Sequence, residues 1–221
     1  MTVNIKFNLS NSSEVVHTTV GFLGIHLDSD LGWKSHIDYI AGKVTKGLFT
    51  LRYLSRVINK KSLLTVYYSH IYSHLSYGVI LWGNQTYANK LFILQKRAVR
   101  IICGATPRTH CKPLFIDLRV LTLPCIFVLN CLVYVKKNFN NYTQCKSIHD
   151  HHTRSINNIY LNQCRYGKTQ NSFEGVSIKL FNTLPNDVKN LPICNFKRKI
   201  QSILQKNPIY NVQDYSNIKW N

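Results

Sequence analysis

The chain has 221 residues, of which 45% are hydrophobic, so it can form one or two domains with a buried core. This composition excludes a chain too polar to fold. Lysine and arginine number 28 against 9 aspartates and glutamates, which gives a formal net charge of +19. A surface with this charge repels itself unless a polyanion covers it, and nucleic acid is the commonest polyanion. We therefore favour a nucleic-acid partner over two alternatives, a merely soluble basic protein and a protein that binds membrane surfaces.

The positive charge is concentrated in one part of the chain. No acidic residue occurs between Tyr39 and Ile116. One-sign fields of this size are unusual on plain soluble domains, so this span is the expected binding region. Its basic residues are Lys43, Lys46, Arg52, Arg56, Lys60, Lys61, Lys90, Lys96, Arg97, Arg100, Arg108 and Lys112.

The cysteines and the apolar runs indicate an intracellular protein, cytoplasmic or nuclear. Seven cysteines are spread along the chain without a Cys-x-x-Cys motif, and residues 1–16 contain no apolar signal core. This pattern favours reduced thiols over a disulfide framework. The most apolar run, residues 125–135, is too short to span a bilayer and predicts a buried helix instead.

The stretch from Phe22 to Ile37 predicts a short strand, a tight turn and the start of a long helix. Apolar residues at 22–27 precede a cluster of turn residues at 28–32. From Trp33 onward, apolar residues recur every three or four positions, which is typical of one face of a helix of about six turns. These residues are Trp33, Ile37, Ile40, Val44, Leu48, Leu51 and Leu54.

Further helical patterns follow along the chain, and Gly104 is suited to end one of them as a left-handed cap. The helix before Gly104 carries like charges at Lys90, Lys96, Arg97 and Arg100, which cost stability unless a partner neutralises them. We favour a face that contacts phosphates over a merely solvated face. The expected helices cover residues 63–82, 89–103, 113–123, 124–137, 171–184, where Asn171 and Glu174 could form a cap, and 195–206.

The fold class expected from these patterns is mainly α, with a short N-terminal β-strand or hairpin, a helical bundle and a smaller α-rich C-terminal segment. Residues 1–20 predict a frayed start that leads into an edge strand. The residues beyond 208 predict a loose tail. The expected units are 1–32, the bundle at 33–137, a polar linker at 138–155 and the C-terminal helical segment at 156–221.

Three groups of residues have spacings that a metal could use, and we favour a structural role for each. His70 and His74 are four apart on one helix, without an acid or a third ligand nearby in sequence. Asp28 and Asp30 are the closest acidic pair, in the turn before the long helix. An irregular third group consists of Cys145, His149, His151 and His152.

The stretch 22–37 resembles the region just after the catalytic palm in reverse transcriptases of jockey-like non-LTR retrotransposons. It reads Leu-Gly-apolar-x-Leu-Asp and then Leu-x-Trp-x-x-His-Ile. Four later segments resemble the same family in the same order along about 180 residues. They are Leu75-Ser76-Tyr77-Gly78 with Trp82-Gly83, Leu94-Gln95-Lys96-Arg97-Ala98 to Ile102, Thr153-Arg154, and Phe181-Asn182-Thr183-Leu184-Pro185 with Phe196-Lys197.

The resemblance implies a palm edge with a primer-grip strand, a thumb-like bundle and the segment after it. Phe22, Leu23 and Gly24 match the primer grip, where glycine would let a primer backbone come close. The implied partner is an RNA–DNA hybrid or RNA held by backbone contacts that do not read sequence. Basic residues on thumb-like helices are the implied contacts: Lys34, Lys43, Lys46, Lys96, Arg97 and Arg100.

The resemblance does not extend to the catalytic part of the family. Nucleotidyl transfer there uses two Mg²⁺ ions held by an aromatic-Ala-Asp-Asp turn and an upstream Asp, and this sequence has no Asp-Asp. We therefore expect a truncated or decayed copy, or one retained for binding, that is inactive alone, with no catalytic residue, no cofactor and no small-molecule substrate. Mg²⁺ would need the missing palm. The alternative is a basic helical interaction module with an acidic protein partner.

Overall fold

The computed structural model describes residues 19–148, 156, 158–161, 165–167, 172–218 and 220. It confirms the expected fold class, because it is mainly helical with one short antiparallel sheet at its N-terminal end. The β-strands are β1 (Val20–Phe22) and β2 (Ile25–Leu27). The helices are α1 (Lys34–Leu54), α2 (Lys60–Tyr67), the π-helix η1 (Tyr68–Tyr72), α3 (Ser73–Ser76), α4 (Val79–Trp82), η2 (Thr86–Ala88), α5 (Asn89–Cys103), α6 (Cys111–Leu118), α7 (Leu123–Lys137), η3 (Phe139–Asn141), η4 (Cys145–Ser147), α9 (Phe173–Asn182), α10 (Asn186–Lys189), α11 (Ile193–Lys206) and η5 (Val212–Asn217).

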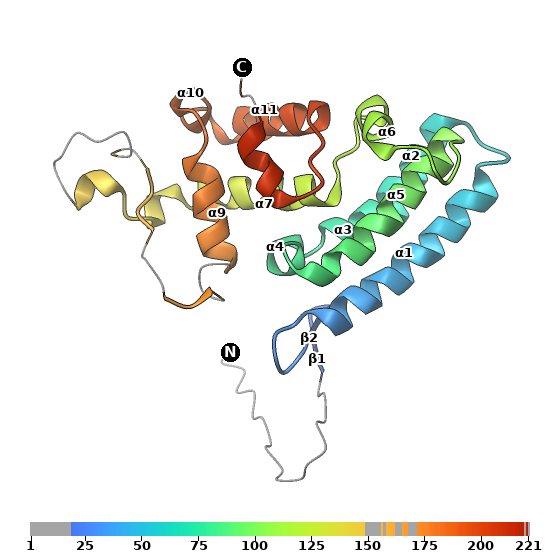
Figure 1. The fold of residues 1–221 in the computed structure, drawn as a ribbon, viewed down its shortest axis with the longest axis horizontal. Coiled ribbons are helices and arrows are strands. Elements are labelled where there is room, and N and C mark those ends of the chain that lie inside the picture. Colours follow the sequence, from blue (N-terminus) through green and yellow to red (C-terminus); the bar gives the residue numbers. More distant parts are fainter. Residues whose placement is uncertain are drawn as a thin grey trace, which may run out of the picture.

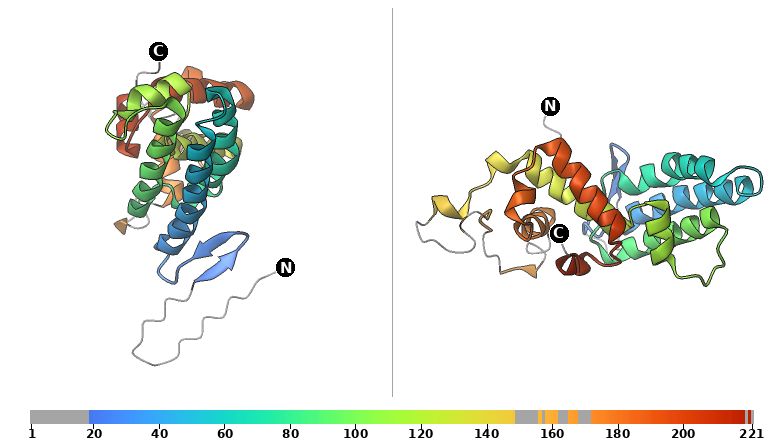
Figure 2. Two further views of the ribbon diagram at one scale, coloured as in Figure 1. Left: turned by 90° about the vertical axis from the view of Figure 1, so that its right-hand side faces the viewer. Right: turned by 90° about the horizontal axis from the view of Figure 1, so that it is seen from above.

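The helices form two groups that meet at α7. Helices α1 and α5 run side by side with the α2–η1–α3 segment, and α9 and α11 pack on α7 in the other group (Figure 1). The β1–β2 hairpin projects beyond the start of α1, as Figure 1 and the left view of Figure 2 show. One continuous hydrophobic core runs through both groups. Helix α7, which we expected to be part of the first bundle, is therefore covered by both groups.

The hairpin turns at Leu23 and Gly24, which both have positive φ angles of 47° and 76°. This conformation matches the twist of a two-residue hairpin, and glycine adopts it without steric cost. The Tyr77 hydroxyl donates a 2.6 Å hydrogen bond to the Leu23 carbonyl and ties the turn to the bundle. The strand expected over 22–27 is thus two strands, and the primer-grip-like residues Leu23 and Gly24 lie in the turn between them.

The single helix expected over 63–82 is interrupted twice. It begins at Lys60, where the Asn59 side chain accepts a hydrogen bond from the Ser62 amide, and it widens into a π-helix at Tyr68–Tyr72. A second interruption comes at Gly78, which has a φ of 59°. Tyr67, Ile71 and Leu75 stay buried through the π-turn.

The helix expected over 113–123 is also shorter, because Arg119 adopts a left-handed conformation and ends α6. The chain then runs extended to Thr122, whose hydroxyl accepts from the Cys125 amide and caps α7. The Thr122 hydroxyl also donates a 2.7 Å hydrogen bond to the Ile209 carbonyl. This bond connects the start of α7 to the C-terminal tail.

The tail beyond residue 208, which we expected to be loose, packs on the core. It forms η5, and Tyr215 is only 2% exposed. Ile209 and Ile218 are also buried. The sequence carries no long periodic pattern here, so the packing could not be inferred from it. Helix α9 starts at the Ser172 cap, one residue after Asn171, which lies outside the described residues.

The Gln95 side chain joins the first bundle to α7. It is fully buried, and its amide nitrogen donates 2.9 Å hydrogen bonds to the Tyr67 hydroxyl and to the Leu121 carbonyl. Its amide oxygen accepts a 2.8 Å bond from the Leu123 amide. Three elements are therefore held together by one residue whose hydrogen-bonding capacity is nearly filled.

Replacing Gln95 by Leu should destabilise the protein by about 3 kcal/mol or more, because it leaves three buried polar groups without their partner at about 1–3 kcal/mol each. Urea unfolding measures the change. The matched variant Tyr67→Phe deletes one partner of the same amide and should cost about 1 kcal/mol. A Gln95→Leu loss no larger than that of Tyr67→Phe would contradict this account.

Replacement of each of two glycines in α1 by alanine should change the free energy of unfolding in opposite directions. A Cβ atom at Gly47 would lie 2.9 Å from both the His70 carbonyl oxygen and an Ile71 side-chain carbon, whereas a Cβ atom at Gly42 would meet nothing. We expect Gly47→Ala to destabilise by about 1–3 kcal/mol through overpacking. Gly42→Ala should stabilise by about 0.5–1 kcal/mol through helix propensity. Urea midpoints that shift in the same direction would show that α1 and η1 are not so closely packed.

Candidate nucleic-acid interface

The α1 lysines of the expected interface are all exposed. Lys34 lies in the first turn of α1. Lys43 and Lys46 lie in its middle, away from its buried side, whose last residue is Leu51. Helix α1 has this orientation because one side is apolar at helical spacing and the core takes up that side. The three lysines can therefore reach a partner in solvent without any change in the fold.

The three basic residues expected on α5 lie in different environments. Arg97 is exposed, as expected for a phosphate contact. The Lys96 ammonium lies 4.6 Å from the centre of the Phe92 ring and 5.5 Å from that of Tyr210, so it is used partly within the fold. The Arg100 guanidinium donates a 3.0 Å hydrogen bond from Nε to the Thr109 carbonyl. The structure thus leaves Arg97 as the most accessible of the three.

The primer-grip-like residues are exposed at the tip of the hairpin. Phe22 is 53% exposed and Leu23 is 74% exposed. Gly24 is also exposed, and its positive φ angle gives it a structural role in the turn. The hairpin and the α1 lysines follow one another along the chain, so the tip lies beyond the N-terminal end of the basic helix (Figure 1).

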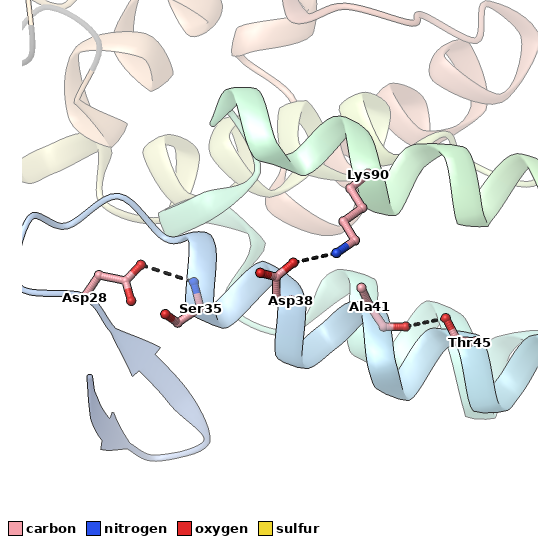
Figure 3. Close-up of polar contacts among 6 residues, drawn as sticks. All are labelled: Asp28, Ser35, Asp38, Ala41, Thr45 and Lys90. Atoms are coloured by element: carbon pink, nitrogen blue, oxygen red, sulfur yellow. Dashed lines mark hydrogen bonds and ion pairs between the residues drawn. The ribbon is translucent and has the colours of Figure 1, made fainter. Parts of the chain in front are cut away.

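The acidic residues near α1 have structural partners. The Asp28 carboxylate accepts a 3.2 Å hydrogen bond from the Ser35 amide in the first turn of α1 (Figure 3). An anion there offsets the positive end of the helix dipole. Asp30 accepts a 2.9 Å bond from the Gly32 amide. These contacts support the structural role that we expected for the pair.

Two ion pairs occur among the described residues, and in each a lysine of the acid-free span pairs with a carboxylate that directly flanks the span. Lys90 pairs with Asp38 between α5 and α1 (Figure 3), and Lys60 pairs with Asp117. Both pairs are exposed and contribute little to stability. Within the part of the chain that the structure describes, the other cations of the span have no carboxylate within 4 Å.

The described residues do not form a metal-binding group of three or more of the candidate ligands. Across the described residues, no group of three or more His, Cys, Asp or Glu side chains could hold a metal ion. His149, His151 and His152 lie outside the described residues. His70 is in η1 and His74 is in α3, and burial lowers the pKa of His74, as do the nearby Lys43 and His70.

His36 is a buried histidine that the sequence did not single out, and it fixes the hairpin to α1. Its ring is 1% exposed, and its Nδ1 accepts a 3.3 Å hydrogen bond from the His26 amide in β2. Its ring edge also meets Trp82 at a centroid distance of 6.0 Å. Burial lowers the pKa of His36 below its ordinary value of 6.5, with a further decrease from His26 and an opposing increase from Asp28.

The exposed aromatic residues of α1 were also missed by the sequence reasoning. Tyr39, Phe49 and Tyr53 lie on the solvent side, beside Lys43 and Lys46. The same helical spacing that identified the buried side could have found them, because 100° per residue places them opposite the apolar stripe.

No single helix in the described ranges is long and apolar enough to cross a membrane. One pair, α6 with α7, reaches the required length and apolarity only together, across a bend of 50°.

The buried His36 should make the protein less stable in mild acid. Since the folded pKa is below 6.5, the unfolded chain binds more protons as the pH falls through 6.5 towards the folded pKa. In that window the free energy of unfolding should fall by at most about 1.4 kcal/mol per pH unit from this group. Urea unfolding between pH 7.5 and 5 measures the loss, and a His36→Gln variant should show less of it. An NMR titration that places the His36 pKa at or above 6.5 would contradict this.

Comparisons with protein-family models, with curated proteins and with solved structures found no match for this chain.

Proposed function

We propose that this chain binds template–primer nucleic acid through backbone contacts, as the primer-grip and thumb region of a non-LTR retrotransposon reverse transcriptase. One observation carries the proposal: the acid-free span 39–116 folds so that Lys43 and Lys46 of α1 and Arg97 of α5 remain exposed. The resemblance of five ordered segments to jockey-like elements supports the polymerase family. Its site of action would be inside the cell, in the cytoplasm or the nucleus.

The physical basis is counterion release. A protein that neutralises phosphates with lysine and arginine releases condensed cations, and this makes binding strong at low salt and weak at high salt. Lys34, Lys43, Lys46 and Arg97 are the exposed cations of the expected set. Lys96 and Arg100 are held partly within the fold, so we assign them a smaller share of the contacts.

The proposed contacts would recognise an RNA–DNA hybrid or RNA by its shape and charge, because backbone contacts fix position without reading bases. No catalytic residue is proposed in this chain, since the aromatic-Ala-Asp-Asp motif of the family is absent from the sequence. The chain would hold the substrate, and the carboxylates that bind Mg²⁺ for nucleotidyl transfer would have to come from elsewhere.

The test is the binding of the purified chain to a fluorescent RNA–DNA primer–template, titrated against salt. Contact with about eight phosphates gives a slope near −7 in a plot of log affinity against log salt. The double variant Lys43→Glu/Lys46→Glu should weaken binding and make the slope shallower by about 2, since each lost phosphate contact removes about 1.

The matched control is Lys197→Glu/Lys199→Glu on α11, which makes the same change in net charge at exposed positions. If this control weakens binding as much as the α1 variant does, net charge alone explains the affinity and the proposed surface is refuted. Salt-insensitive binding, or none, would instead favour the alternative, a helical module for an acidic protein partner.

A further inference from the structure

The outer side of α1 carries three exposed aromatic side chains, and one of them, Tyr39, also meets the His26 ring at a centroid distance of 4.5 Å. Phe49 is 73% exposed, Tyr53 is 68% exposed and Tyr39 is 43% exposed. Scattered apolar residues are common on surfaces, but these three lie on the same side of one helix. The arrangement calls for a physical reason other than packing, because the core of α1 lies on its opposite side.

The geometry of α1 places these rings among cations. At 100° per residue, Phe49 and Tyr53 form a neighbouring pair four residues apart, and Lys46 lies one turn before them on the same side. Tyr39 and Lys43 form a second pair, with the ammonium 5.3 Å from the ring centre. The stretch from Tyr39 to Tyr53 is about 21 Å long.

Gly42 lies between Tyr39 and Phe49 along α1 and leaves the helix backbone open. A Cβ atom there would touch nothing, so packing does not require glycine at this position. Glycine inside a helix is unfavourable, and a close approach by another molecule is one of the uses that offsets its cost. The uncovered backbone between the rings is therefore suited to a partner that lies along α1.

Aromatic rings interleaved with cations are the means by which proteins hold single-stranded nucleic acid. Unpaired bases stack on the rings, and the basic residues follow the phosphates. A duplex cannot use the rings in this way, because its bases already stack inside the helix. The phosphate contacts of α1 are open to any nucleic acid, whereas its rings favour unpaired strands.

We infer that the outer side of α1 binds single-stranded nucleic acid, with bases stacked on Phe49 and Tyr53 and phosphates at Lys43 and Lys46. The inference rests on the proposed function and adds to it a preference of the α1 rings for unpaired strands. Tyr39 extends the same track towards the hairpin.

Charge complementarity selects this occupant over an apolar protein surface. The acidic residue within α1, Asp38, is paired with Lys90 of α5 (Figure 3). An apolar partner that covered the rings would also have to remove Lys43 and Lys46 from water without a counter-charge, which is costly. A polyanion with exposed bases satisfies both the rings and the lysines.

The experiment compares two oligonucleotides of equal length and charge, a thymidine single strand and its abasic counterpart, by fluorescence anisotropy at one salt concentration. We expect the thymidine strand to bind at least about tenfold more tightly, because only it can stack. The double variant Phe49→Leu/Tyr53→Leu keeps apolar, helix-forming side chains but removes the rings. It should lose most of this preference and keep its affinity for the RNA–DNA hybrid within about twofold.

The control variant Tyr166→Leu removes an exposed ring, 78% accessible, from another part of the chain and should change neither affinity. Circular dichroism checks that all variants are folded. Equal binding of thymidine and abasic strands, or an unchanged preference in the double variant, would overturn the inference while leaving hybrid binding and the proposed function intact. Absence of binding to every nucleic acid would overturn the proposed function itself.

Discussion

The buried amide of Gln95 is the interaction on which the architecture depends. It connects α2, α5 and the extended segment before α7. It forms hydrogen bonds with the Tyr67 hydroxyl, the Leu121 carbonyl and the Leu123 amide, which are its partners at this junction. A buried polar network of this kind is stabilising only when every member has a partner. The Thr122 hydroxyl continues the connection to the tail through Ile209. The two helical groups therefore share one hydrophobic core and one buried hydrogen-bond network, and the outer side of α1 remains exposed to solvent.

Much of the fold was predictable, because long amphipathic helices can be recognised from the regular spacing of their apolar residues. Helices α1 and α5 and the cap at Gly104 follow from local pattern and from glycine's tolerance of positive φ. The π-turn at Tyr68–Tyr72 and the packed tail do not, since both depend on tertiary contacts. The π-turn lies against α1, where Gly47 closely approaches the His70 carbonyl, and the tail is held by Thr122, which is 87 residues before Ile209.

The charge of the candidate site was predictable from the sequence, but the contacts of its individual side chains were not. A span without acids is visible in the sequence, and exposed lysines on α1 follow from the position of its apolar stripe. The engagement of Lys96 with Phe92 and Tyr210 could not be foreseen, because Tyr210 comes from the tail that carried no periodic signal. The role of His36 was likewise hidden, since its ring contacts the hairpin and Trp82, which come from other parts of the chain.

Charged and aromatic side chains are distributed differently over the surface, so charge and stacking would contribute differently to binding. Cations are spread over α1, α5 and the C-terminal helices, so long-range attraction to a polyanion belongs to the whole molecule. Exposed rings beside lysines are instead arranged along α1, and stacking acts only at contact. Charge would therefore govern how fast and how strongly any nucleic acid is attracted, whereas the rings would decide which strand remains on α1. Because the inner side of α1 is fixed by the core and by Gly47, its outer side can hold a strand without moving the bundle.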